Sequence, residues 1–233
     1  MSVRRIFRSC LAIVLLSPAL RAQMPAQASS PSLPAKHVKK SSPTSESKVD
    51  SGSVSDQVYL NKSFGIACKI PAGWVLRTEE MNSRDGASDA GQAEAKDAGK
   101  VRDASGGRVL LAAFSRPPEA RAEDVNASIL IAAESSAAYP GLKDAAQYFG
   151  PVIEVAKAQG FEIDDDPYEF VVGTKPVVRG DFQKDVGTRV MRQSTLVMLA
   201  RGYAVSFTFI GGTEDEVEEL VQGLSFVAAK TAH

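Results

Sequence analysis

The stretch FGIACKIPAGW, residues 64–74, has the pattern of a β-strand that ends in a turn. Its larger side chains stand at every second position, namely Phe64, Ile66, Cys68 and Ile70. A period of two is expected of a strand with one buried face. Pro71 and Gly73 then interrupt the chain before Trp74 begins another predicted strand. This phase puts Cys68 in the buried row.

Further strands are predicted on both sides of this stretch. Before it, Val58 and Leu60 alternate with polar neighbours, which predicts a strand that buries these two side chains. After it, strands are predicted at 74–76, 108–115, 127–134, 168–172, 176–183, 189–200 and 203–210. Turns at 173–174, 185–187 and 201–202 join the last four strands. Links this short imply antiparallel neighbours.

Two amphipathic helices accompany the strands. From 142 to 159 apolar side chains recur every three or four residues, and Pro151 falls within this pattern without changing its phase. One kinked helix is therefore predicted. Thr213 and Glu216 form a capping box at the start of a last helix, in which each side chain binds the backbone N–H group of the other residue. The order of elements predicts an α+β fold, an antiparallel β-sheet covered by helices.

Residues 1–22 have the features of a secretory signal peptide. Arginines precede a short apolar run at 11–16, and the small residue Ala22 stands at the expected cleavage point. Cleavage after Ala28 is the alternative. An uncleaved anchor is disfavoured because the run is shorter than the roughly 20 residues of a spanning helix. Cys10 would leave with the signal peptide, so Cys68 alone could form no internal disulfide.

The remaining chain divides into a tether and one folded domain. Residues 23–56 are rich in Ser, Pro and Lys and have no apolar period, which predicts a disordered tether. Residues 57–228 are predicted to fold, with a mobile insertion at 82–107 that has almost no apolar side chain larger than alanine. From residue 57 onward there are 25 acidic and 19 basic residues. A domain this acidic is a poor nucleic-acid binder.

Residue types that usually carry catalysis are scarce. The two histidines, His37 in the tether and His233 at the C-terminus, are placed where no site would hold them. This argues against Ser-His-Asp catalysis, Cys-His catalysis and ordinary zinc sites. Cys68 is interpreted as a core residue, because nothing on its strand face would lower the pKa of the thiol. Trp74 is likewise interpreted as a core anchor, and no P-loop motif occurs.

Acidic residues are the remaining candidates. Asp164-Asp165-Asp166 is the densest carboxylate cluster, and hard cations such as calcium take several oxygen ligands. Three adjacent residues cannot all converge on one ion, so a solvated turn before Pro167 is the favoured interpretation. The helix macrodipole and an exposed face explain the acidic residues of the last helix, namely Glu214, Asp215, Glu216, Glu218 and Glu219.

Four pieces of the chain together resemble the PsbP-like superfamily. They are YLNKSFGIACKIPAGW at 59–74, LKDAAQYFGPVIEVAKAQGF at 142–161, YAVSFTFIGG at 203–212 and GLSF at 223–226. The most distinctive part is the aromatic-Gly-x4-Ile-Pro-x-Gly-Trp opening. The resemblance implies an α/β/α sandwich around a central antiparallel sheet. Because members lack a shared catalytic site, it also implies a binding or assembly role. The insertion at 82–107 departs from the compact family pattern.

These observations predict an exported, non-enzymatic domain, periplasmic or secreted, that docks a protein partner or an envelope component. No catalytic, cofactor-binding or metal-binding residue is assigned. Neither nucleic-acid binding nor a membrane span after signal cleavage is expected. Two alternatives stay open: a hydrolase that works with carboxylates alone, as glycosidases do, and a metal-ion-binding module. A cleft that holds two carboxyl groups from distant strands would favour the hydrolase.

Overall fold

The computed structural model describes residues 49–83, 107–120, 122 and 124–227. The expected signal peptide, most of the expected tether and the central part of the expected insertion lie outside these residues. From residue 50 onward the described chain belongs to one compact unit. No helix in the described part is long and apolar enough to cross a lipid bilayer.

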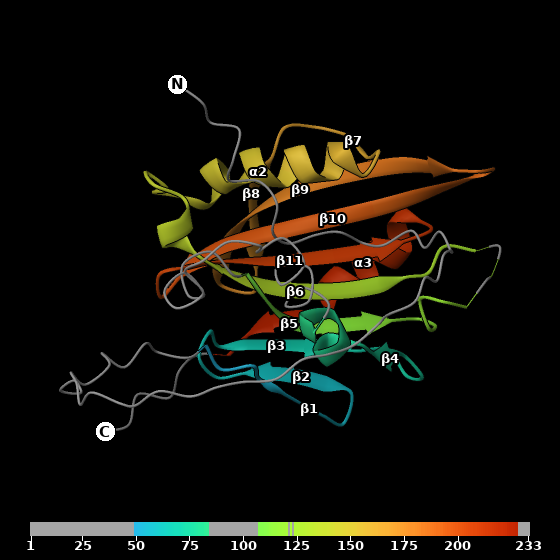
Figure 1. Cartoon of the computed structure of the whole chain (residues 1–233), viewed down its shortest axis with the longest axis horizontal. Helices are drawn as coiled ribbons and strands as arrows, with labels where there is room; N and C mark the ends of the chain where they lie inside the picture. Colours follow the sequence, from blue (N-terminus) through green and yellow to red (C-terminus); the bar gives the residue numbers. More distant parts are fainter. Residues whose placement is uncertain (1–48, 84–106, 121, 123, 228–233) are drawn as a thin grey trace, which may run out of the picture. The chain divides into compact units, whose positions relative to one another are not determined.

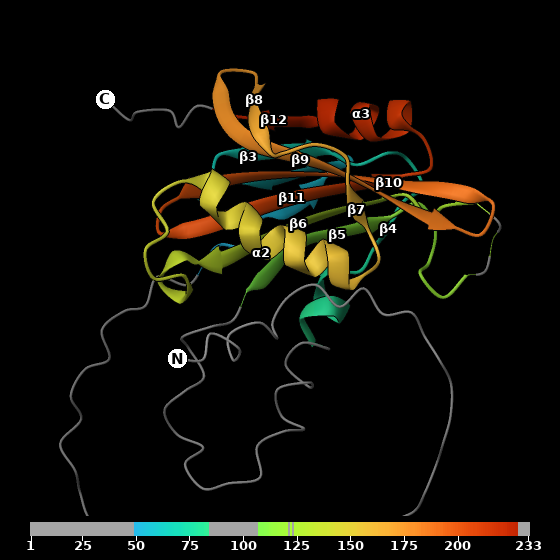
Figure 2. The same ribbon diagram turned by 90° about the horizontal axis from the view of Figure 1, so that it is seen from above.

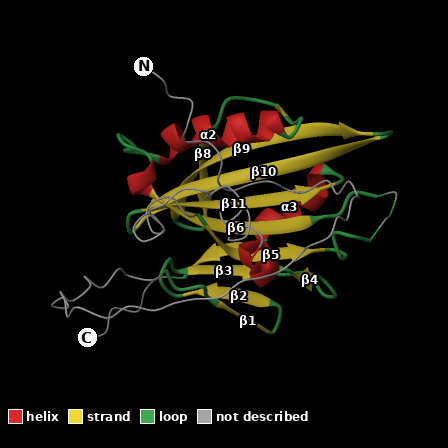
Figure 3. Ribbon diagram, viewed as in Figure 1, coloured by secondary structure: helices red, strands yellow, loops and turns green. Residues whose placement is uncertain are grey.

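Most strands form one large antiparallel sheet (Figures 1 and 3). They are β4 (Val75–Leu76), β5 (Arg108–Phe114), β6 (Ser128–Ser135), β7 (Glu162–Ile163), β8 (Tyr168–Val172), β9 (Lys175–Val186), β10 (Arg189–Ala200) and β11 (Tyr203–Gly211). The strand order is β4-β5-β6-β11-β10-β9-β7, and β8 also pairs with β9. The sequence predicted all of these strands except the two-residue β7.

The β9–β10–β11 meander shows why the local sequence predicts this part well. β10 and β11 pair over nine residues each, up to the pair Ala200 and Tyr203. The two residues between them, Arg201 and Gly202, both have positive φ, 53° and 80°. A type I′ hairpin requires positive φ at both central positions. The turn therefore fixes the register of the two central strands.

A second antiparallel sheet has four short strands. In order, they are β1 (Ser53–Ser55), β2 (Val58–Asn61), β3 (Ile66–Lys69) and β12 (Leu224–Phe226). Cys68 lies opposite Leu224 in the β3–β12 pairing. The sequence predicted neither β1 nor β12. β12 pairs with the distant strand β3, whereas β1 forms a hairpin with β2 through Asp56 and Gln57. Because β1 lies within residues 23–56, the predicted boundary of the tether is wrong at its C-terminal end.

The buried face of β2 is the opposite of the one predicted. Tyr59 and Asn61 are each 1% exposed, whereas Leu60 is 39% exposed. Asn61 Nδ2 donates hydrogen bonds to Tyr59 Oη and to the Asp50 carbonyl oxygen, at 3.1 and 2.8 Å. Tyr59 Oη donates in turn to the Ser51 carbonyl oxygen. Because its amide group has partners inside the fold, Asn61 can be buried where an apolar residue was expected. The phase predicted for Ile66 and Cys68 in β3 is confirmed.

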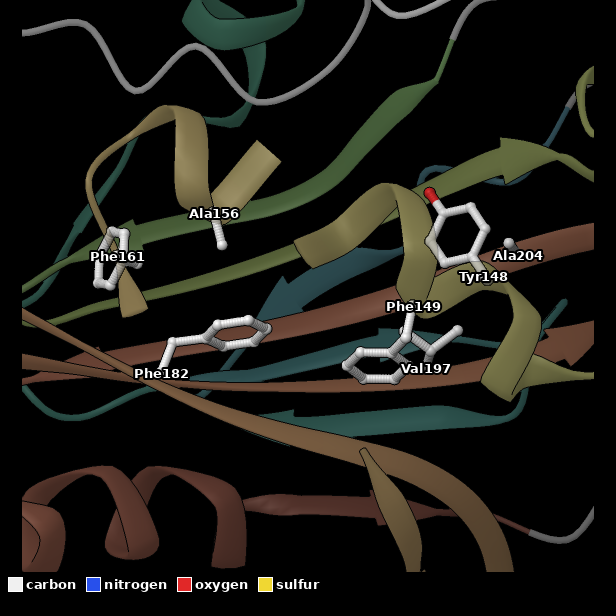
Figure 4. Packing of buried hydrophobic residues seen from close by; sticks show 7 residues of the cluster. All are labelled: Tyr148, Phe149, Ala156, Phe161, Phe182, Val197 and Ala204. Carbon is white, nitrogen blue, oxygen red and sulfur yellow. The ribbon is translucent and has the colours of Figure 1, made fainter. Parts of the chain in front are cut away.

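Helix α2 (Ala145–Ala158) lies against one face of the large sheet (Figure 2). It begins after Asp144, whose carboxylate accepts a hydrogen bond from the backbone N–H of Gln147. Pro151 lies inside the helix, so one continuous helix is confirmed, and its kink stays a prediction. A buried cluster joins α2 to the sheet (Figure 4): Tyr148, Phe149, Ala156, Phe161, Phe182, Val197 and Ala204.

Helix α3 (Glu214–Gln222) lies on the opposite face of the large sheet (Figure 2). Thr213 Oγ accepts a hydrogen bond from the Glu216 N–H, which confirms the first half of the capping box. The second half differs, because the Glu216 carboxylate accepts from the N–H of Gly212 and not from that of Thr213. The glutamate side chain therefore reaches back to the residue before the N-cap.

The arrangement of layers differs from the predicted α/β/α sandwich in one respect. An antiparallel sheet with helices on it is confirmed, but α3 shares its side of the large sheet with the second sheet. Phe207 of β11 meets Phe226 of β12 edge to face, with ring centroids 5.9 Å apart. Tyr203 and Phe64 meet in the same way. Strands therefore supply part of a layer in which only helices were expected.

Candidate functional site

A polar cleft of about 250 Å³ lies beside α3. Its floor comes from β9 and β10, and its walls come from α3 and the segment that joins β7 to β8. Arg179 and Asp181 stand two residues apart on β9, so they share a face, and Ser194 of β10 is the register partner of Asp181. Glu218 approaches the same point from α3. The fold thus gathers polar and charged residues from three elements.

Arg179 is at the centre of this cleft. Its side chain is 8% exposed. Nε donates to both carboxylate oxygens of Asp181, at 3.0 and 3.1 Å, and Nη2 donates to Ser194 Oγ at 2.8 Å and to Glu218. Burial alone would lower the pKa of Arg179, but the hydrogen bonds and charges of Glu218 and Asp181 outweigh it and raise that pKa. The guanidinium stays charged and held in place.

Asp181 accepts hydrogen bonds from three side chains. Besides Arg179 Nε, Tyr168 Oη donates to Oδ2 at 2.9 Å, and Ser194 Oγ donates to Oδ1. Desolvation, together with the hydrogen bond to Asp181, raises the pKa of Tyr168 to about 12. A carboxylate that accepts from three donors has few lone pairs left for a substrate. Asp181 is therefore suited to holding Arg179 and poorly suited to attacking a substrate.

The rim of the cleft carries charged side chains that have no hydrogen-bond or ion-pair partner among the described residues. Asp164, Asp165 and Glu214 line it on the acidic side, and Arg192 lines it on the basic side. Desolvation raises the pKa of Asp164, and the nearby charge of Arg192 opposes this shift. A neighbouring hollow of about 550 Å³ shares Arg192 and Glu214 with the cleft. The two hollows therefore meet at this pair of residues.

The structure brings some of the sequence candidates to the cleft. Asp164 and Asp165 line it, as do Glu214 and Glu218 of the last helix. The sequence predicted a solvated turn for the aspartates and an exposed helix face for the glutamates. It did not predict that these residues line one cleft. Among the described residues, no acidic, cysteine or histidine side chains form a group of three that could hold a metal ion.

The remaining candidates lie away from the cleft or outside the described residues. Cys68 is fully buried, and burial raises the pKa of its thiol to about 12. Trp74 is only half-buried, so its interpretation as a core anchor is wrong. It follows a turn that contains Pro71 and Gly73, directly before β4. His37 and His233 lie outside the described residues.

Sequence reasoning missed the central residues of the cleft, Arg179, Asp181 and Ser194. One signal was present in the sequence of β9. Arg179 and Asp181 carry opposite charges and share one face of this strand, which also contains the buried apolar residues Val177 and Phe182. Two opposite charges at i and i+2 on a buried strand indicate an internal ion pair. The contribution of Glu218 could not be predicted in this way, because it comes from a helix 39 residues away.

Comparison with known proteins gives structural neighbours and no sequence family. No protein-family model matches the chain, and no curated protein matches it. The fold is similar to cyanobacterial PsbP from Synechocystis sp. PCC 6803, with 16% identity and a TM-score of 0.41 over 75% of this chain and 98% of that chain. It is also similar to LpqN of Mycobacterium tuberculosis, described as involved in cell envelope biogenesis, with 14% identity and a TM-score of 0.33 over 70% and 83%.

A third neighbour is PA94 of Pseudomonas aeruginosa, a protein of unknown function described as a putative regulator. It has 18% identity and a TM-score of 0.31 over 43% of this chain and 68% of that chain. Cyanobacterial PsbP is among the neighbours, all three of which have TM-scores below 0.5. Membership of the PsbP-like superfamily stays a prediction.

Proposed function

We propose that this protein is an exported, non-enzymatic binding domain of the PsbP-like type, and that it docks a protein partner or envelope component at the cleft beside α3. One observation carries the proposal: Arg179 and Asp181 on the cleft floor and Glu218 on the α3 wall are hydrogen-bonded to one another, whereas the charges on the rim have no such partners among the described residues. Arg179 holds Asp181 and Glu218. Such a floor gives the rim a fixed geometry and offers no free nucleophile or base.

The charge of the rim indicates the kind of partner. Asp164, Asp165 and Glu214 outnumber Arg192 there, so a basic segment of the partner fits better than an acidic one. Because these groups lie at the surface, their attraction would act mainly on the association rate and would weaken with added salt.

Capture from envelope extract tests the proposal. The mature protein should retain a stoichiometric partner, and the double variant Asp164→Lys, Glu214→Lys should lose it. Glu154→Lys is the matched control, because Glu154 is exposed on α2 at the other face of the sheet. Capture should also fall as salt rises from 50 to 500 mM. Equal capture by the wild type and by the rim variant would contradict docking at this cleft.

The carboxylate hydrolase remains the second candidate, because the cleft does bring together acidic residues from distant segments. Asp164, Asp181 and Glu218 come from the β7–β8 segment, β9 and α3. Desolvation also raises the pKa of Asp164, as a general acid requires. Turnover of a panel of aryl glycosides that is lost in Asp164→Asn and in Glu218→Gln, but kept in Glu154→Gln, would favour the hydrolase over the binding domain.

A further inference from the structure

The outer edge of β5 is only partly covered by a strand. β4 pairs with the last two residues of β5, with Val75 opposite Phe114 and Leu76 opposite Ala113. The next backbone bond, from Arg77 N–H to the Ala112 carbonyl oxygen at 2.9 Å, ends this pairing. From residue 78 to 83 the chain is helical. The rest of the β5 edge therefore has no strand beside it within the described part of the chain.

Side chains of the helical residues 78–83 satisfy this edge instead. Thr78 Oγ1 accepts a hydrogen bond from the Ala112 N–H at 3.0 Å. Asn82 Oδ1 accepts from the Val109 N–H at 3.0 Å, and Asn82 Nδ2 donates to the Val109 carbonyl oxygen at 2.9 Å. Thr78 and Asn82 are four residues apart, so they lie on the same face of the helix.

The Asn82 carboxamide imitates a strand residue. At every second position of an antiparallel pair, a residue binds both the N–H and the C=O group of the residue opposite. Asn82 makes the same two bonds to Val109 through its side chain. The helical residues 78–83 thus stand where a further strand would pair, and they use side-chain groups in place of backbone groups. This also protects the edge against unspecific pairing.

This cover is weakly attached compared with the strand beneath it. The side chains of Val109, Leu110, Leu111 and Ala112 are 0 to 6% exposed. In contrast, every residue from 77 to 83 is half-buried or exposed. Met81 packs against the apolar group of Val109, Ala112 and Phe114. Segments with few buried apolar contacts open at lower free energy than the core that they cover.

We propose that the β5 edge is a strand-addition site, at which an extended segment of a partner protein displaces the helical residues 78–83 and pairs with Val109 to Ala112. The proposal rests on the proposed function, since it supplies a second contact for the docked protein. An extended segment fits because both hydrogen-bonding groups of Val109 and of Ala112 point to this edge.

A partner segment is a better occupant than a second copy of this chain. Edge-to-edge pairing of two copies through β5 would displace the helical cover of both, whereas a partner segment displaces one. The site is distinct from the cleft beside α3, to which the edge of β5 contributes no lining residue.

Amide hydrogen exchange followed by NMR is the first test, and it needs only the wild-type protein. The Val109 and Ala112 amides should exchange at least about 10-fold faster than those of Ile131 and Phe207, which are paired within the sheet. Release of the cover would then occur without global unfolding. Exchange of Val109 and Ala112 at the same rate as Ile131 and Phe207 would overturn the proposal.

Binding of a strand peptide is the second test. The probe is a fluorescent peptide of residues 128–135, SILIAAES, because this sequence pairs antiparallel with β5 at its other edge. The double variant Thr78→Val, Asn82→Leu should bind it at least about 10-fold more tightly than the wild type, and a scrambled peptide should not bind. Ser83→Ala is the control, because Ser83 Oγ binds the Glu79 carbonyl oxygen and not β5.

The outcomes separate this proposal from docking at the cleft. Asp164→Lys, Glu214→Lys should leave peptide binding unchanged, so that a failure of cleft docking does not affect this test. Equal peptide affinity in the wild type and in the Thr78, Asn82 variant would overturn strand addition. Self-association of that variant on size-exclusion chromatography, without peptide binding, would also overturn it, and would mean that the helical residues only protect the edge.

Discussion

Gly180 of β9 lies directly beneath the ring of Phe149 of α2. A Cβ atom at Gly180 would stand 2.6 Å from Cε1 of Phe149, closer than the roughly 3.5 to 4.0 Å at which carbon atoms pack. Phe149 is 1% exposed and belongs to the cluster between α2 and the sheet (Figure 4). The absence of a side chain at Gly180 therefore sets how closely the helix approaches the sheet.

Gly180→Ala should destabilise the protein by about 1 to 3 kcal/mol, because the added methyl group overpacks the layer between α2 and β9. Urea unfolding measures the change. Adding Phe149→Leu should recover part of the loss, since the smaller side chain leaves room for the methyl group. Gly150→Ala is the control: a Cβ there meets no atom within 4 Å, and alanine in α2 should be neutral or stabilising by up to about 1 kcal/mol.

Arg179→Leu should cost about 3 kcal/mol in the free energy of unfolding. The substitution leaves Asp181 and Glu218 close together without their common cation, and breaking a buried ion pair on one side costs about 3 to 5 kcal/mol. The lower end applies because these carboxylates are 27% and 37% exposed. Arg192→Leu removes the same charge from a residue without an ion pair in the described structure, and should change stability by no more than about 0.5 kcal/mol. Equal losses would contradict the central role of Arg179.

The Cys68 thiol should resist alkylation in the native protein and react only after unfolding, with the label located by peptide mapping. Burial raises its pKa to about 12, so almost no thiolate exists at neutral pH. Cys68→Ser should cost about 1 to 3 kcal/mol, because a hydroxyl replaces an apolar group at a fully buried position. Rapid labelling of the native thiol, with unchanged stability of the serine variant, would show a reactive cysteine instead.

Glu134 at the end of β6 should make stability depend on pH. Burial raises the pKa of its carboxyl above the ordinary 4.5, although Tyr139 Oη donates a hydrogen bond to it. The folded state therefore keeps a proton that the unfolded state releases, and stability falls as pH rises from about 4.5 through the raised pKa. Glu134→Gln should reduce this fall and raise the melting temperature at pH 7 to 8. An unchanged profile in Glu134→Gln, or the same change in the exposed Glu154→Gln, would contradict the assignment.

Export is tested by the intact mass of the mature protein. Cleavage of the signal peptide predicts a chain that starts at Gln23 or, if the enzyme cuts after Ala28, at Ser29. Recovery of the full-length chain from the cytoplasm would refute export, and with it the proposed envelope partner.

Local patterns in the sequence determined most of the secondary structure. The bounds of β10 were predicted as they occur, and those of β11 to within one residue, because an Arg201-Gly202 turn joins two long runs of strand-forming residues. α3 was located by Thr213, whose side chain caps the helix. In each case the residues that determine the element are neighbours along the chain. Their interactions can therefore be predicted without knowledge of the fold.

Some strand faces bury polar residues whose hydrogen-bond partners lie elsewhere in the chain. Only the tertiary structure decided which faces these are. Asn61 is buried because Tyr59 and Asp50 receive its amide hydrogens, and no period of apolar residues could indicate this. β12 exists because β3 lies beside it. The cleft joins Arg179, Asp181 and Glu218 from a strand and a helix that come together only when the sheet is covered. Burial of a charge is tolerable only when such partners converge, and that convergence is a property of the folded chain as a whole.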